Sequence, residues 1–125
     1  VTTQFELRAK QLAQTADGGS WMATGSSFPC TVVDLSIGGC AMEADQEMLE
    51  GERVSLNLPL LDQWVEIRAT CVHQGSREDG QNTVRYGLEF RELSMAQEDV
   101  LHKAVMSMQR EALSGDEEEE DPAAV

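Results

Sequence analysis

The sequence predicts an all-β domain closed by one C-terminal helix, with about six antiparallel strands arranged as a small barrel or sandwich. Three observations predict it. Short segments alternate apolar and polar residues with a period of two, which is typical of half-buried strands. Turn signals rich in glycine, aspartate and serine separate these segments. After residue 94 the period changes to that of an amphipathic helix. The 125 residues suffice for one domain with a core and are too few for two.

The first half of the chain carries strands that are separated by two expected turns. Residues 3–10 alternate apolar and charged side chains, which predicts a half-buried strand. Turns are expected at residues 17–20 and 25–27, where glycine and serine gather, with a short strand over residues 20–24 between them. A β-branched strand over residues 28–35 then leads into a tight turn.

The remaining strands are expected at residues 40–43, 53–58, 64–72 and 83–91. Pro59 is expected to close the strand before it, because proline cannot donate a hydrogen bond to a strand ladder. The polar, glycine-containing residues 74–82 predict a long hairpin loop between the last two strands. All of these strands are short and lie in sequence order, so antiparallel pairing is expected throughout.

A helix is expected to follow the strands. Ser94 and Gln97 have the spacing of a capping box, in which each side chain accepts a hydrogen bond from the backbone N–H of the other residue. Gly115 is expected to end the helix, and the acidic run after it should be disordered by its own charge repulsion. The predicted organisation is a domain of residues 1–113 followed by an acidic disordered tail of residues 114–125. One apolar helix face is formed by Val100, Leu101, Ala104, Val105, Met108 and Ala112.

The overall charge restricts the classes of partner. The net charge is −14, and it is −8 without the six acidic residues of the run at 116–121. A body this acidic repels nucleic-acid polymers and anionic membranes at long range. No stretch approaches the roughly 20 apolar residues of a membrane span, and charged residues interrupt any signal-peptide core at the start. We therefore expect a cytoplasmic protein with no membrane span.

No catalytic or metal-binding arrangement is visible in the residues. His73 and His102 are the two histidines, and neither has a nucleophile as a partner in the sequence pattern. The three cysteines, Cys30, Cys40 and Cys71, lack metal-site spacing and sit within apolar patterns, so buried reduced thiols are expected. The sequence therefore predicts a binding protein that is not an enzyme and that uses no cofactor or metal.

The most informative segment is the turn Asp-Leu-Ser-Ile-Gly-Gly at residues 34–39, hereafter the 34–39 turn. The side chains of Asp34 and Ser36 can hydrogen-bond to the backbone or to a ligand. Gly38 and Gly39 are expected to allow positive φ and to leave room for a flat ligand or a phosphate near the main chain. On these residues alone, a purely structural turn and a ligand-binding turn are both open.

The chain resembles the PilZ domain family. Asp34-x-Ser36-x-x-Gly39 matches the family's (Asp/Asn)-x-Ser-x-x-Gly motif. The segment 85–90, Arg-Tyr-Gly-Leu-Glu-Phe, is similar to the strand that completes the PilZ barrel, and a serine-initiated helix follows as in the family. The resemblance covers roughly residues 1–113 and is strongest to the YcgR-like flagellar brake branch. It implies a six-stranded antiparallel PilZ-type β-barrel.

The resemblance also implies a function. PilZ domains bind cyclic di-GMP, and the ligand-binding roles would fall to Asp34, Ser36, Gly38 and Gly39 of this chain. The domain would couple the second-messenger level to motility or biofilm output through a protein partner in the flagellar or polysaccharide-export machinery. Pairing with a second copy of the chain, as a homodimer, is also left open by the sequence.

One departure from the family is large. The family's second motif, Arg-x-x-x-Arg, occurs nowhere in this sequence, although it supplies cations for the guanine and phosphate of the ligand. Two explanations stay open. The chain begins at Val1, beside the place where the motif would end, so truncation is one. The other is a degenerate PilZ domain that binds no nucleotide and serves as a protein-interaction adaptor.

Overall fold

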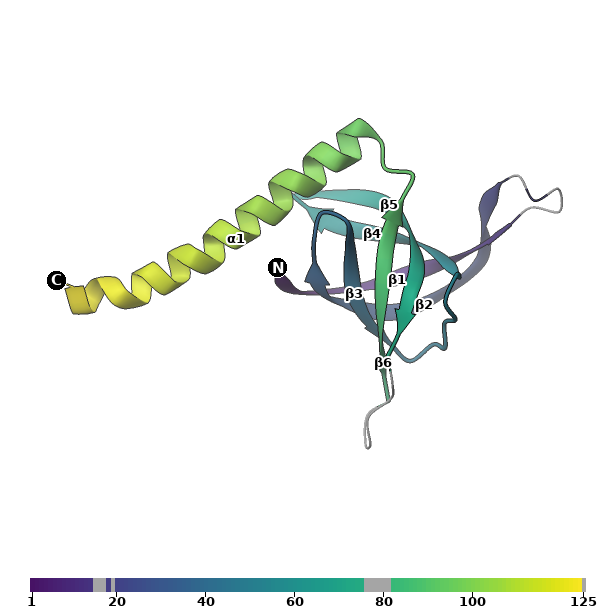
Figure 1. Ribbon diagram of the computed structural model, residues 1–125, viewed down its shortest axis with the longest axis horizontal. Coiled ribbons are helices and arrows are strands. Elements are labelled where there is room, and N and C mark those ends of the chain that lie inside the picture. The colour runs from purple at the N-terminus through teal and green to yellow at the C-terminus, as the bar shows by residue number, and fades with distance from the viewer. Residues whose placement is uncertain (15–17, 19, 76–81, 125) are drawn as a thin grey trace.

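The computed structural model describes residues 1–14, 18, 20–75 and 82–124, with side chains described as far as residue 112. Its elements are β1 (Thr2–Gln14), β2 (Trp21–Leu35), β3 (Gly39–Ala44), β4 (Arg53–Leu60), β5 (Gln63–Gln74), β6 (Val84–Arg91) and α1 (Met95–Ala124). The strands close into a barrel in the order β1-β2-β3-β6-β5-β4, and every pairing is antiparallel (Figure 1). The predicted fold class is confirmed.

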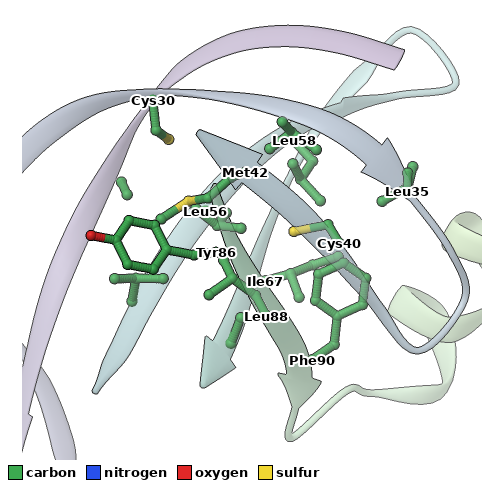
Figure 2. Packing of buried hydrophobic residues seen from close by; sticks show 14 of the residues in the cluster. Cys30, Leu35, Cys40, Met42, Leu56, Leu58, Ile67, Tyr86, Leu88 and Phe90 are labelled. Atoms are coloured by element: carbon green, nitrogen blue, oxygen red, sulfur yellow. The ribbon is translucent and has the colours of Figure 1, made fainter. Parts of the chain in front are cut away.

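The barrel interior is filled by the apolar residues of the alternating pattern. Along β6, Tyr86, Leu88 and Phe90 point inward, where they meet residues of β3, β4 and β5 (Figure 2). The Tyr86 hydroxyl donates a hydrogen bond to the Gln46 carbonyl at 2.9 Å and accepts one from the Met48 N–H at 3.1 Å. This buried hydroxyl therefore fastens the connection between β3 and β4 to the core.

The strand β2 is longer than the sequence predicts. The turn expected at residues 25–27 is absent, and the strand runs without a break from Trp21 to Leu35. The register shows why: Lys10 pairs with Ser27, whereas Leu12 pairs with Ala23, so the extra residues form a β-bulge. Gly25 takes the positive φ of 89° within this bulge.

The strand β4 also passes the point where it was expected to stop. Pro59 lies inside the strand, paired with Trp64 of β5, and the strand ends at Leu60. On the other side, β1 pairs only with the residues from Arg53 to Ser55. Proline is tolerated because one edge of β4 is unpaired at this point and needs no N–H donor.

The helix α1 begins with the predicted capping box. The Ser94 N–H donates to the Gln97 Oε1 at 2.8 Å, and the Gln97 N–H donates to the Ser94 Oγ at 3.1 Å. The Gln97 Nε2 also donates to the carbonyl of Glu66 at 2.7 Å, which ties the helix start to β5. The capping prediction is confirmed.

The packed face of α1 is shorter than expected. Leu101, Ala104 and Val105 are buried against the barrel, and Val100 and Met108 are partly buried, but Ala112 is exposed. The rest of the helix projects beyond the barrel (Figure 1).

The end of α1 also differs from the prediction. The helix does not end at Gly115 but continues to Ala124. An interior glycine costs a helix only about 1 kcal/mol, and the glutamates that follow are good helix formers. The division into a domain of residues 1–113 and a tail of residues 114–125 stays a prediction.

Two predicted features fall outside the described residues. The structure does not describe residues 17 and 19 of the turn predicted at 17–20. It also does not describe residues 76–81 of the hairpin loop predicted at 74–82. Within the part of the chain that is described, no helix combines the length and the apolar character needed to cross a bilayer.

Candidate functional site

The 34–39 turn joins β2 to β3. Leu35 pairs with Cys40, so the four residues between them reverse the chain. The Gly39 carbonyl closes the turn, because it accepts hydrogen bonds from the Ser36 N–H at 2.9 Å and from the Ser36 Oγ at 3.1 Å. The proton of the Ser36 hydroxyl is thus used inside the turn, and its lone pairs remain able to accept from a ligand.

The two glycines of the turn serve a purpose different from the predicted one. Neither Gly38 nor Gly39 has a positive φ, so the expectation of left-handed backbone was wrong. A Cβ atom on Gly39 would overlap the carbonyl oxygen of Leu88, whereas a Cβ on Gly38 would meet nothing within 4 Å. The Phe90 N–H donates to the Gly38 carbonyl at 2.9 Å. The glycine at residue 39 is needed because β3 and its turn lie tightly against β6.

The Asp34 carboxylate stands on the outer face of the barrel, beside the turn. Its side chain is 49% exposed, and its Oδ1 accepts a hydrogen bond from the Val1 ammonium at 3.1 Å. The same ammonium donates to the Leu35 carbonyl at 2.7 Å. The start of the described chain therefore lies directly against the carboxylate that the sequence singles out.

Strand pairing places a row of residues across the outer face next to Asp34. Asp34 on β2 pairs with Ala41 on β3, Ala41 pairs with Gly87 on β6, and Gly87 pairs with His73 on β5. Ala41 and Gly87, in the middle of this row, have small side chains or none, so the surface is hollowed between Asp34 and His73. The resulting hollow, hereafter the outer-face pocket, has a volume of about 370 Å³.

The outer-face pocket brings together all four residues that the sequence predicts for a ligand site. Asp34, Ser36, Gly38 and Gly39 line it, together with Ala41 and Gly87 as its floor. Neither floor residue is among the four that the sequence predicts. A signal for Gly87 was present, because Tyr86 and Leu88 are inward-facing core residues and the residue between them must face outward.

A second hollow continues the outer-face pocket along β2, β3 and β6. It has a volume of about 520 Å³, and both Asp34 and Arg85 line it. Arg85 faces outward two residues before Gly87 and pairs across the strands with Glu43. Within the described residues, its guanidinium has no hydrogen bond or ion pair. Arg85 is therefore a cation on the same face as Asp34, although it belongs to no Arg-x-x-x-Arg motif.

The thiols beneath the turn are not reactive groups of this site. Cys40 follows the turn directly but points into the core, and burial raises its pKa to about 12. Burial likewise raises the pKa of Cys30 to about 11. Both thiols stay protonated near neutral pH, and nucleophilic or metal-binding thiolates require the opposite. The expectation that all three cysteines are buried and free of disulfides is confirmed.

Comparisons with known proteins agree with this architecture. A family model described as the PilZ domain matches residues 15–107. This chain belongs to the PilZ domain family. Its fold is similar to that of the PilZ domain with c-di-GMP of YcgR from Escherichia coli, with a TM-score of 0.58 and 22% identity over 91% of this chain and 95% of that one.

A second solved PilZ structure shares the fold. It is the PilZ domain of CeSA from a cellulose-synthesizing bacterium, with a TM-score of 0.54 and 16% identity. The match covers 87% of this chain and 96% of that one. No curated protein sequence matches this chain. The outer-face pocket therefore lies on the surface of a PilZ barrel.

Proposed function

We propose that this PilZ domain is a receptor for cyclic di-GMP, which binds in the outer-face pocket. The observation that carries the proposal is the position of the Asp34 carboxylate at the edge of a flat floor made by Ala41 and Gly87. The YcgR PilZ domain, which shares this fold, has c-di-GMP in its structure. The fold and the local chemistry thus support the same ligand.

Guanine suits this arrangement chemically. Its N1–H and exocyclic N2–H groups are two donors on one edge, and a carboxylate accepts two such bonds side by side. No long side chain rises from Ala41 or Gly87, so the flat base can lie against the barrel surface with its edge toward Asp34. The open lone pairs of the Ser36 hydroxyl can accept from a further ligand donor.

The phosphodiesters of the ligand need positive charge, because Asp34 and Glu89 make the outer-face pocket acidic. Arg85 lies on the same face and lines the hollow that adjoins Asp34, so we assign it to a phosphodiester oxygen. A guanidinium and a phosphate form a charge-assisted pair. One arginine supplies less charge than the two in the family motif, so we expect weak binding by residues 1–125 alone.

Binding would be transmitted to a protein partner, with motility or biofilm formation as the output. The start of β1 provides the route, because Thr2 pairs with Asp34 and also lines a hollow beside Met108 of α1. A ligand that engages Asp34 would reposition this end of the strand. The surface between the start of β1 and the helix would then change, which is the change a partner can detect.

The rival function is a PilZ adaptor that binds no nucleotide. Its specific support is the absence of Arg-x-x-x-Arg from the 125 residues, together with the acidic lining of the outer-face pocket. An adaptor would bind its protein partner whether or not the second messenger is present.

Calorimetric titration with cyclic di-GMP at low salt distinguishes the two functions. We expect weak binding by the chain as it stands, and tighter binding when a designed Arg-Ser-Ser-Ser-Arg segment is fused before Val1. Asp34→Ala should abolish the heat, whereas Asp45→Ala, an exposed aspartate on the same barrel, should not. Absence of heat from the fused protein refutes the receptor proposal. Unchanged binding by Asp34→Ala refutes the assignment of the site but not of the ligand.

A further inference from the structure

A second cluster of charged side chains lies on the outer face of β4 and β5. The Glu92 carboxylate, just after β6, bridges two arginines: its Oε1 is 3.8 Å from Arg53 Nη1, and its Oε2 is 3.5 Å from Arg68 Nη1. Arg91 pairs with Arg68 across the strands. Arg53, Arg68 and Arg91, hereafter the arginine cluster, thus gather on one face of a strongly acidic protein.

Two hydroxyl groups lie between these arginines. Ser55 pairs with Arg68, and Arg53 pairs with Thr70, so the four side chains share one face of two neighbouring strands. Ser55 is 4% exposed and Thr70 is 8% exposed, although both face away from the barrel core. Within the described residues, neither hydroxyl has a hydrogen-bond partner. A buried hydroxyl without a partner is unfavourable, so these groups are donors that the fold itself leaves unused.

An aromatic ring and a carboxylate hold the Arg53 guanidinium in place. The Arg53 guanidinium stacks on the Trp21 ring, with its carbon 4.5 Å from the ring centroid. Glu92 adopts a positive φ of 55°, which L side chains rarely adopt, and its carboxylate reaches both arginines from there. The Glu92 side chain is 59% exposed, so an anion from solvent can reach the position of its carboxylate.

We propose that the arginine cluster is a second ligand site, which binds the phosphate group of a small soluble molecule in place of the Glu92 carboxylate. Arg53 and Arg68 would pair with the phosphate oxygens, since a guanidinium fits phosphate as well as carboxylate. Ser55 and Thr70 lie beside the two arginines on the same face, so their hydroxyls would donate to the same oxygens. The four residues assigned to the phosphate, Arg53, Arg68, Ser55 and Thr70, do not line the outer-face pocket. Arg91, the third arginine of the cluster, pairs instead with Glu89 of that pocket at 3.3 Å.

Titration with inorganic pyrophosphate in a phosphate-free, low-salt buffer tests this site. We expect saturable binding by the wild-type chain and a dissociation constant about tenfold lower for Glu92→Gln, which removes the competing carboxylate. Arg68→Gln should weaken binding about tenfold or more, because it removes one charge-assisted hydrogen bond to the phosphate. The matched control is Arg110→Gln, an exposed arginine of α1 that makes the same change in net charge.

Thr70→Val separates a ligand site from a structural ion cluster, because it removes a hydroxyl and leaves every charge in place. We expect weaker pyrophosphate binding in a protein that folds at least as stably as the wild type. The proposal is overturned if neither the wild type nor Glu92→Gln binds saturably. It is also overturned if Arg110→Gln weakens binding as much as Arg68→Gln, or if Thr70→Val leaves the affinity of the wild type unchanged.

Discussion

Gly39 lies against the backbone carbonyl of Leu88, so closely that a Cβ atom at residue 39 would overlap the carbonyl oxygen. The two residues are far apart in the sequence but adjacent in the barrel, where β3 pairs with β6. This contact fixes how near the 34–39 turn sits to Gly87, and with it the depth of the outer-face pocket.

Alanine substitutions at the two glycines should therefore have unequal effects. Gly39→Ala forces β3 away from β6, and we expect it to lower the free energy of unfolding by about 2 kcal/mol or more. Gly38→Ala meets no neighbour within 4 Å and has no positive φ, so its effect should stay within about 0.5 kcal/mol. Urea denaturation measures both. Equal losses for the two variants would show that the close approach at Gly39 is unimportant.

The 34–39 turn also shows what a sequence can predict locally. Its existence, its polar side chains and its place between two strands followed from residue types alone. The reason for Gly39 did not, because the obstacle is a carbonyl from a strand some fifty residues later. That oxygen lies beside Gly39 only because β3 pairs with β6, and residue types alone do not predict this pairing.

The floor of the outer-face pocket could likewise be predicted only in part from the sequence. The alternation of residues 84–90 places Tyr86 and Leu88 in the core and Gly87 on the outer face, and this period is visible in the sequence. It did not give the strand order β2-β3-β6-β5, and without that order Ala41 and Gly87 cannot be placed beside Asp34. In contrast, the capping box at Ser94 is a local pattern and was predicted in full.

Filling the pocket floor should abolish nucleotide binding without unfolding the barrel. Ala41→Leu places a bulky side chain on the low surface beside Asp34, at a strand position that faces outward and tolerates it. We expect the heat of cyclic di-GMP binding to disappear while the melting temperature changes little. Asn57→Leu, an exposed position on the outer face of β4, is the control. Binding that survives Ala41→Leu would place the base elsewhere.

The unpartnered hydroxyl of Thr70 should make the wild-type protein less stable than it could be. Valine at this position keeps the branched shape and removes a buried polar atom that has no partner in the described structure. We expect Thr70→Val to raise the free energy of unfolding by about 1 kcal/mol. Thr31→Val, at a partly exposed position, should have a smaller effect. Destabilisation by Thr70→Val would mean that the hydroxyl has a partner in solution.

The Tyr86 hydroxyl should contribute to stability through the connection between β3 and β4. Tyr86→Phe leaves the Met48 N–H and the Gln46 carbonyl without this partner, and we expect a loss of about 1–2 kcal/mol. Hydrogen exchange adds a local measurement. The amide of Met48 should exchange faster because it loses its acceptor. The exchange rates of the β6 amides should rise only as much as the loss of global stability requires. An unchanged Met48 amide would contradict the assigned bond.

The buried thiols predict how stability depends on alkaline pH. Burial raises the pKa of Cys30 to about 11 and that of Cys40 to about 12, from an ordinary value of 9.0. Above pH 9 the unfolded chain therefore loses these protons while the folded chain keeps them. The stabilisation is fully present below pH 9 and is lost as pH rises toward the folded values. Each thiol adds a slope of about 1.4 kcal/mol per pH unit in that window.

Comparison of the wild type with Cys40→Ala isolates this effect from other groups that titrate at alkaline pH. The substitution leaves a small cavity, which lowers stability at every pH by the same amount. The removed thiol changes only the pH dependence, so the curve of unfolding free energy against pH should be flatter for the variant between pH 9 and about 12. Urea denaturation at a series of pH values measures both curves. Parallel curves would mean that Cys40 ionises as readily in the folded protein as in the unfolded chain.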